Sequence, residues 1–422
     1  MGKKILDWLL NNKTTDQTIA KNTFWLFAGQ VGSRLLRAGI VIYSARLLGA
    51  SSWGAFSYAI GIAAFLTIFS DIGINALITK EASRNPELKN RYLSTALFIK
   101  LTLLAVFITV VAITAPYLSN IAEAGALIPI IIFVFAFDTL RDLGSALSRA
   151  MEKMEIEAGI NILTNFLITA LGFILLAIRP TSQSLAIAYA LGSGLGLIAI
   201  FFALRKHFSG LLKNFTKSLI RPILVTAWPF GLMGLMGVVM LNTDIVMLGW
   251  LVSPEQIGFY SAAQKPIQLL YVLPALLASS IFPVMSRLAK TDKAAMRKLL
   301  KKYLKIAMIA AAPVAIFGFL LAVPIINILF GAAYLPAVAA FRILVLSVLV
   351  VYPSTLIGNA IFAYDHHREF IKYTLTAIIG NIALNATLIP SLGIEGAALS
   401  TLFTQLITNV LIWRKLKTVT TP

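Results

Sequence analysis

The 422-residue sequence contains no cysteine and only three histidines. Without cysteine, the chain can form neither disulfides nor thiolate metal sites. The histidines, His207, His366 and His367, all lie in polar stretches between apolar runs. We therefore expect neither thiol chemistry nor a metal centre.

Charge is also scarce, and acidic charge is the scarcer kind. Charged residues make up 13% of the chain, whereas soluble domains carry about a quarter. Hydrophobic residues make up 59%, and the mean hydropathy is +0.86. The formal net charge of +19 would indicate nucleic-acid binding in a soluble protein. In an integral membrane protein, topology explains it better, so we predict a membrane protein without a nucleic-acid partner.

Long apolar runs divide the chain into membrane spans. A helix needs about 20 apolar residues to cross the hydrocarbon core, and about twelve runs satisfy this. The predicted spans are 22–48, 53–79, 91–116, 125–148, 156–178, 183–205, 221–250, 255–286, 303–329, 336–363, 369–390 and 393–414.

Most of the 36 basic residues fall in alternate connections between these spans, and only Arg46 and Arg179 lie in the opposite connections. Because cytoplasmic connections carry the Lys/Arg excess, both termini are predicted to be cytoplasmic. The expected location is the cell inner (plasma) membrane. The basic run 287–305 predicts contact with anionic lipids at the cytoplasmic surface. The polar N-terminal segment predicts no cleavable signal peptide, and Ile5, Trp8 and Leu9 suit a brief interfacial helix.

An internal repeat divides the chain into halves. The segment Gly54–Ala59 matches Gly258–Ala263 at an offset of 204 residues, close to half the chain. This predicts an all-α membrane protein with two six-helix bundles related by a pseudo-two-fold axis along the membrane normal. The predicted parts are a cytoplasmic segment 1–21, a first bundle 22–205, a basic linker 206–220, a second bundle 221–414 and a cytoplasmic tail 415–422.

Basic side chains inside the spans are candidates for substrate binding. A charge in the bilayer core costs at least roughly 2.5 to 3.5 kcal/mol, so such residues are functional candidates by default. The predicted substrate-binding residues are Arg34, Arg37, Lys100, Lys265 and Arg342. Their excess over acids favours an anionic substrate, and arginine is suited to phosphate. Arg34 and Arg37 are the strongest candidates because no acid lies within one helical turn of either.

Acidic side chains inside the spans are candidates for gating or ion coupling, namely Asp71, Asp138 and Asp244. The coupling ion would be H⁺ or Na⁺, and no cofactor is expected. Arg141 lies three residues after Asp138 and one before Asp142, so these residues predict a structural ion-pair lattice. No nucleophile triad or acid/base carboxylate pair is compatible with the topology. We therefore predict a transporter with no catalytic residues.

Three stretches resemble a known family, namely Leu47–Ala59, Phe69–Asn75 and Gly393–Ser400. They are similar to the Wzx-type polysaccharide and O-antigen flippases of the multidrug/oligosaccharidyl-lipid/polysaccharide exporter superfamily. The resemblance implies alternating access by two six-helix bundles of the multidrug and toxin extrusion (MATE) type. It also implies transport of undecaprenyl-diphosphate-linked oligosaccharides across the inner membrane, for O-antigen, capsule or exopolysaccharide. A polysaccharide polymerase complex would be a partner.

Other functions remain open at this stage. An ion-coupled multidrug/cation antiporter of the related multidrug and toxin extrusion family shares the twelve-helix plan, but would need mainly acidic residues facing its substrate. A lipid II flippase typically has two further helices, which this length does not supply. A membrane glycosyltransferase or ligase is disfavoured because the sequence has no large external loop.

Overall fold

The computed structural model describes residues 10–12, 14–85, 87–114, 119–208 and 210–420. Every regular element in these ranges is helical, which confirms the all-α prediction. The interfacial helix predicted through Ile5, Trp8 and Leu9 lies outside the described residues.

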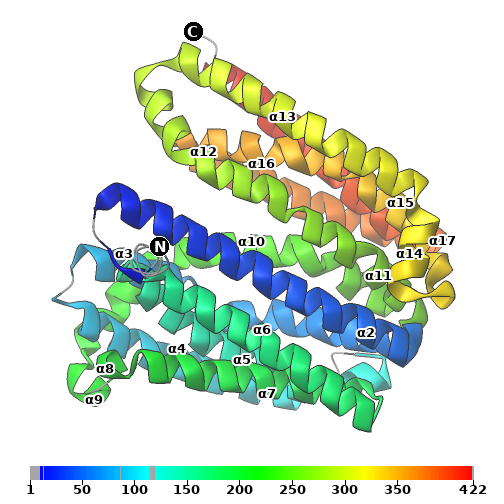
Figure 1. Cartoon of the computed structure of the whole chain (residues 1–422), viewed down its shortest axis with the longest axis horizontal. Coiled ribbons are helices and arrows are strands. Elements are labelled where there is room, and N and C mark those ends of the chain that lie inside the picture. The colour runs from blue at the N-terminus through cyan, green and yellow to red at the C-terminus, as the bar shows by residue number, and fades with distance from the viewer. Residues whose placement is uncertain (1–9, 13, 86, 115–118, 209, 421–422) are drawn as a thin grey trace, which may run out of the picture. The chain divides into compact units, whose positions relative to one another are not determined.

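The helices are labelled in Figure 1. In the first half they are α2 (Thr15–Asp71), α3 (Ile74–Arg84), α4 (Lys89–Thr114), α5 (Ala122–Ala150), α6 (Met154–Ile178) and α7 (Ser182–Ala203). Short elements follow: α8 (Arg205–Phe208), α9 (Leu211–Asn214) and η2 (Lys217–Leu219). The second half contains α10 (Ile220–Leu251), α11 (Pro254–Leu270), α12 (Val272–Thr291), α13 (Lys293–Leu320), α14 (Ala322–Phe330), η3 (Ala332–Ala337), α15 (Val338–Leu346), α16 (Val348–Ala363) and α17 (His367–Thr420).

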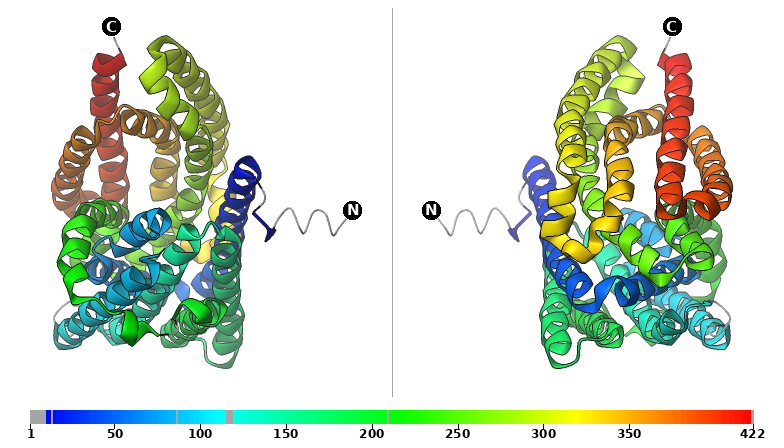
Figure 2. Two further views of the ribbon diagram at one scale, coloured as in Figure 1. Left: turned by 90° about the vertical axis from the view of Figure 1, so that its left-hand side faces the viewer. Right: turned by 90° about the vertical axis from the view of Figure 1, so that its right-hand side faces the viewer.

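Ten helical segments in the described ranges are long and apolar enough to cross a membrane. Two of them, in α2 and α17, are about twice the length that one crossing needs. Each contains one non-helical glycine, Gly49 (φ 75°) and Gly393 (φ 59°). Glycine adopts positive φ without a Cβ clash, so the chain can turn there. Figure 2 shows α17 as two rods, orange and red. Counted as two crossings each, α2 and α17 bring the number to the predicted twelve.

The helices form two compact units. Unit 1 comprises residues 1–48 and 59–238, and unit 2 comprises residues 49–58 and 239–422. Inside unit 1, α5, α6 and α7 pack side by side (Figure 1), and Ile74, Leu93 and Leu143 belong to a core shared by α3, α4 and α5. Inside unit 2, α16 packs against α12, α13 and α17. The residue ranges predicted for the two bundles, the linker and the terminal segments stay predictions.

The repeated segments touch each other within unit 2. The Oγ atoms of Ser57 and Ser261, which are 204 residues apart, lie 2.9 Å from each other. A Cβ on Gly54 would lie 1.8 Å from the carbonyl oxygen of Pro254, and one on Gly258 would lie 2.0 Å from that of Ala50. Both clashes involve backbone atoms. Glycine at these repeat-related positions therefore allows close helix packing.

One predicted span, 53–79, is wrong as a continuous helix. The backbone breaks between α2 and α3, where Ile72 (φ 40°) and Gly73 (φ 85°) both adopt left-handed conformations. Positive φ is unusual for a β-branched residue and marks local strain. The first turns of α10 press against this break, because a Cβ on Gly73 would lie 2.2 Å from the carbonyl oxygen of Ala227. Asp71 is consequently the last residue of α2 and lies at a helix end.

Three further predicted spans, 255–286, 303–329 and 336–363, are interrupted near Tyr271, Leu321 and Ser347. At the first, Pro274 has no N–H to donate to the carbonyl of Leu270. The hydroxyl of Tyr352 donates to that carbonyl instead, at 3.1 Å. A tertiary contact thus satisfies the backbone group that the proline leaves open.

Candidate functional site

The first polar cluster, here called the Lys100 cluster, comprises Asp71, Asn75, Lys100 and Thr139 in unit 1. Lys100 in α4 is fully buried, with 0% of its side chain exposed, and its Nζ lies 2.8 Å from Asp71 Oδ1. It also donates to Asn75 Oδ1 at 2.8 Å and to the carbonyl of Thr139 at 2.9 Å. A buried ammonium group requires such compensation. The ammonium group of Lys100 therefore contacts three oxygen atoms of the protein. The substrate contact predicted for Lys100 stays a prediction.

A short ion-pair row continues along α5. Arg141 Nη1 donates to Asp138 Oδ1 at 2.6 Å, and its Nη2 lies 3.5 Å from Asp142 Oδ1. Asp142 is half-exposed, so solvent screens the longer pair more strongly. Both pairs have the sequence spacing from which a structural lattice was predicted. The coupling role of Asp138 stays a prediction.

Arg34 and Arg37 lie one turn apart in α2, also in unit 1. Arg37 Nε donates to Asn165 Oδ1 at 2.9 Å, and its guanidinium lies 5.1 Å from the ring centroid of Tyr189. Arg34 is exposed and makes no hydrogen bond or ion pair with the described part of the chain. A carboxylate pairs with neither arginine in the described ranges. Arg37 is therefore oriented by neutral groups that leave its positive charge uncompensated.

The second polar cluster, here called the Asp244 cluster, comprises Asp244, Tyr260, Asn381, Asn385 and Thr401 in unit 2. Asp244 in α10 is only 3% exposed. Its Oδ2 accepts hydrogen bonds from the hydroxyls of Tyr260, at 2.6 Å, and of Thr401. Its Oδ1 accepts from Asn385 Nδ2 at 2.7 Å and from Asn381 Nδ2 at 3.3 Å.

All of the donors in the Asp244 cluster are neutral. Within the described residues Asp244 has no ion pair, and no group of three or more His, Cys, Asp or Glu residues could hold a metal. Neutral donors stabilise a carboxylate but leave its charge in place. Asn385 Oδ1 is buried and has no hydrogen-bond partner among the described atoms. The cluster therefore combines the buried carboxylate of Asp244 with an amide oxygen that has no hydrogen-bond donor, Asn385 Oδ1. Such a set of oxygens could bind a proton or a small monovalent cation.

The other two predicted basic residues, Arg342 and Lys265, lie in unit 2. Arg342 in α15 donates to the carbonyl of Phe319 at 3.3 Å, and its guanidinium lies 5.4 Å from the Phe319 ring centroid. Lys265 is half-buried in α11, next to Pro266. Their substrate roles stay predictions.

The neutral polar partners were not identified from sequence. They are Asn75, Asn165, Tyr260, Asn381, Asn385 and Thr401. One signal was available for two of them, because Asn381 and Asn385 are amides four residues apart in an apolar span and so share one helix face. Polar residues at such positions mark functional or inter-helix contacts.

Known proteins share this architecture. Two structures superpose over most of the chain: the lipid II flippase MurJ in its inward closed conformation, and a multidrug resistance MATE family transporter of the MOP superfamily in an inward-facing conformation. MurJ gives a TM-score of 0.79 at 18% identity, covering 93% of this chain and 87% of MurJ. The MATE transporter gives 0.75 at 14% identity, covering 92% and 95%. The TM-scores establish the fold alone, and they confirm the predicted MATE-like architecture.

Two sequence relatives come from Haloferax volcanii. The probable flippase AglR is 34% identical over 177 residues, which span 41% of this chain and only 37% of AglR. The probable low-salt glycan biosynthesis flippase Agl15 is 23% identical over 399 residues, which span 93% of this chain and 82% of Agl15.

The family model described as polysaccharide biosynthesis protein matches residues 19–289, which is more than half of the chain. This match agrees with the resemblance seen in the sequence. The relatives are named as flippases, and the superposed proteins as a flippase and a transporter. The chain is a multi-pass membrane protein that belongs to the polysaccharide biosynthesis protein family of flippases and transporters.

Proposed function

We propose that this protein is a flippase for a glycan linked to a polyprenyl diphosphate, used in surface polysaccharide biosynthesis. Family membership and the two relatives with flippase names support this proposal. Undecaprenol as the carrier, O-antigen as the product, the inner membrane as the location and a polymerase as a partner belong to the same proposal. The relatives are archaeal, so each of these finer assignments requires its own test.

The proposed orientation and mechanism follow from charge. The asymmetric distribution of basic residues supports cytoplasmic termini. The transport mechanism is alternating access, with the polyprenyl tail remaining in lipid. Domains 22–205 and 221–414 are the proposed moving bundles, and the basic run 287–305 contacts anionic lipid headgroups.

The uncompensated pair Arg34 and Arg37 is the observation that carries the proposal. Arg37 is oriented by Asn165 and Tyr189, and Arg34 is exposed without a partner in the described ranges. Two guanidinium groups on adjacent turns of one helix can donate to neighbouring phosphate oxygens. A cationic drug would be repelled by the same pair, which disfavours the alternative multidrug antiporter.

The test is transport by Arg34→Ala and Arg37→Ala variants. A hydrogen bond to a charged group contributes about 1.5–3 kcal/mol, so each variant should transport at least roughly tenfold more slowly. Translocation of a fluorescent lipid-linked glycan in proteoliposomes measures the rate. Arg179→Ala, which removes an exposed arginine from a connection, is the matched control. Wild-type rates in both test variants would contradict the phosphate role.

We infer further that Asp244 couples transport to an ion gradient. The support is its burial among neutral donors beside the unpartnered Asn385 Oδ1. Asp244, Asn385 and Thr401 would supply oxygens to Na⁺, or Asp244 alone would accept H⁺. A hard cation with oxygen ligands would be weakly held with a single carboxylate, as a reversible coupling ion requires.

Asp244→Asn tests the coupling because the amide is nearly isosteric but cannot carry the charge. Transport in proteoliposomes should lose its dependence on an imposed Na⁺ or pH gradient, while passive exchange of the substrate persists. Asp142→Asn, at a half-exposed aspartate, is the control. Gradient-driven transport at the wild-type level in Asp244→Asn would exclude Asp244 as the coupling group.

A further inference from the structure

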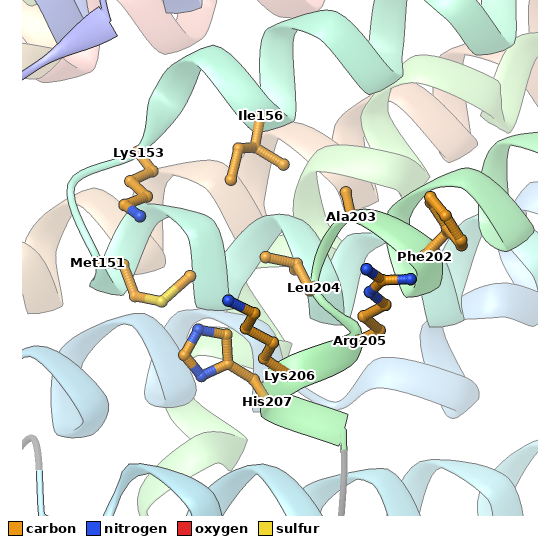
Figure 3. A pocket seen from close by; sticks show the side chains of 9 residues that line it. All are labelled: Met151, Lys153, Ile156, Phe202, Ala203, Leu204, Arg205, Lys206 and His207. Atoms are coloured by element: carbon orange, nitrogen blue, oxygen red, sulfur yellow. The ribbon is translucent and has the colours of Figure 1, made fainter.

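A cavity of about 410 Å³ lies at one end of unit 1, and none of its lining residues belongs to either polar cluster. It is formed by the end of α7, by α8, by the connection between α5 and α6 and by the start of α6 (Figure 3). Its volume falls in the range of about 300–1,000 Å³ that is usual for small-molecule sites. Nothing in the proposed transport mechanism uses it.

The polar lining of the cavity is basic. It consists of Lys153, Arg205, Lys206 and His207, and no carboxylate is among the described residues that line it. Figure 3 shows Lys153 and Lys206 entering the space from opposite sides. Like charges brought together from separate elements repel, and a bound anion would remove that repulsion.

The basic lining also changes the pKa of His207. Its pKa is lowered from the ordinary value, first by burial and then by Lys89 at the start of α4, by Lys153 and by Lys206. At neutral pH the ring is therefore uncharged and can donate one hydrogen bond. A bound dianion would oppose the lysine charges and raise the pKa again.

The remaining lining is apolar, including Met151, Ile156, Phe202 and Leu204. Phe202 is 68% exposed, and Ile198, one turn earlier on α7, is 65% exposed. α7 is a candidate membrane span ending at Ala203, so these side chains form an apolar strip that leads along the span to the cavity. The guanidinium of Arg205 lies over the Phe202 ring at 4.9 Å, where the strip and the basic lining meet.

We propose that this cavity binds a phosphate-bearing anion, and that its occupant is the headgroup of an acidic phospholipid whose acyl chains lie along Ile198 and Phe202. Basic pockets at the membrane surface recognise such headgroups, while the apolar strip accommodates their chains. The site is independent of the glycan substrate, so it stands or falls separately from the proposed flippase function. A free phosphate would satisfy the basic lining but would leave the apolar strip unused.

The experiment measures equilibrium binding to the purified full-length chain in detergent by titration calorimetry. The probes are dioctanoyl phosphatidic acid, dioctanoyl phosphatidylcholine and inorganic phosphate. The test variant is Arg205→Gln with Lys206→Gln. The matched control is Lys213→Gln with Lys217→Gln, which removes two exposed charges from the same connection outside the cavity. Lys153→Gln tests the opposite wall if the double variant proves unstable.

Phosphatidic acid should bind the test variant roughly tenfold or more weakly than wild type, because two basic side chains near the headgroup are lost. The control should bind within about twofold of wild type on the same reasoning. Tighter binding of phosphatidic acid than of inorganic phosphate identifies the lipid as the source, and equal binding identifies free phosphate. Equal binding of phosphatidylcholine and phosphatidic acid, or equal losses in the test and control variants, would overturn the proposal.

Nuclear magnetic resonance of labelled histidine gives a second readout. The resonances of His207, assigned with His207→Gln, should report a higher pKa once phosphatidic acid is bound. Affinity should correspondingly rise as the pH falls through the pKa of His207. An unchanged His207 pKa at saturating phosphatidic acid would place the lipid elsewhere.

Discussion

The Lys100 cluster and the Asp244 cluster bury opposite charges and compensate them in different ways. Buried Lys100 faces the carboxylate of Asp71 at 2.8 Å. Buried Asp244 accepts hydrogen bonds from two hydroxyls and two amides, all neutral. The first cluster pairs a lysine with a carboxylate, whereas Asp244 has no ion pair within the described residues.

This difference favours a structural role for the Lys100 pair and supports the coupling role proposed for Asp244. The buried Lys100–Asp71 pair and the hydrogen bonds of Lys100 link α2, α3, α4 and α5. A ligand that displaced Asp71 would leave a buried charge unpaired, which is unfavourable in free energy. A carboxylate that accepts hydrogen bonds only from neutral groups can exchange a proton or a cation without first breaking an ion pair. The sequence identifies both residues as charges in apolar spans, from which it predicts substrate binding for Lys100 and gating or ion coupling for Asp244.

Breaking the Lys100 pair should have the largest effect. Asp71→Ala leaves a fully buried ammonium group, which should lower the free energy of unfolding by roughly 3–5 kcal/mol. Thermal unfolding in detergent measures the loss. Asp71→Ala combined with Lys100→Met removes both charges and should recover most of it. An Asp71→Ala variant as stable as wild type would show that the pair is not structural.

Removing one donor from Asp244 should have an intermediate effect. Tyr260→Phe deletes a buried hydroxyl that donates to Asp244 at 2.6 Å, which should lower the free energy of unfolding by about 1.5–3 kcal/mol. The loss should shrink in Na⁺ if the ion replaces the missing donor. Unfolding curves with and without Na⁺ measure both quantities. Tyr43→Phe, at a tyrosine without a described hydrogen bond, should be neutral, and an equal loss in both variants would disprove the special role of Tyr260.

The smallest effect is expected at Asp142. Its carboxylate is half-exposed and 3.5 Å from Arg141, so Asp142→Asn should change the free energy of unfolding by less than about 1 kcal/mol. Denaturation at low and high salt would check this, since a screened pair loses its contribution as salt rises. A loss as large as that of Asp71→Ala would contradict this expectation, because it would mean that the Arg141–Asp142 pair is part of the Lys100 cluster.

Several features were predictable because they depend on one helix at a time. Hydropathy located the spans, and the spacing of Asp138 and Arg141 indicated a local pair. The match of Gly54–Ala59 with Gly258–Ala263 identified segments that do contact each other through Ser57 and Ser261. The resemblance to polysaccharide flippases agrees with the family to which the chain belongs.

Other features were not predictable, because they depend on contacts between helices. The break at Ile72 and Gly73 lies against the backbone of α10, whereas a hydropathy scan treats those residues as part of a span. The cavity beside α8 requires Lys153 and Lys206 to converge from separate connections. The donors to Asp244 come from α11 and from both halves of α17.

Composition and periodicity were sufficient to specify an all-helical membrane protein, the approximate positions of its spans, its charge asymmetry and which charged residues lie within apolar spans. Only the tertiary structure decided that Asp71 neutralises Lys100 and that Asp244 is surrounded by neutral donors. The physical reason is that transfer of a residue into the membrane depends on its own polarity and its neighbours along the helix. Charge compensation depends instead on which helices pack together, because two charges interact strongly only within a few ångströms. Residues that close in space can be far apart in the sequence.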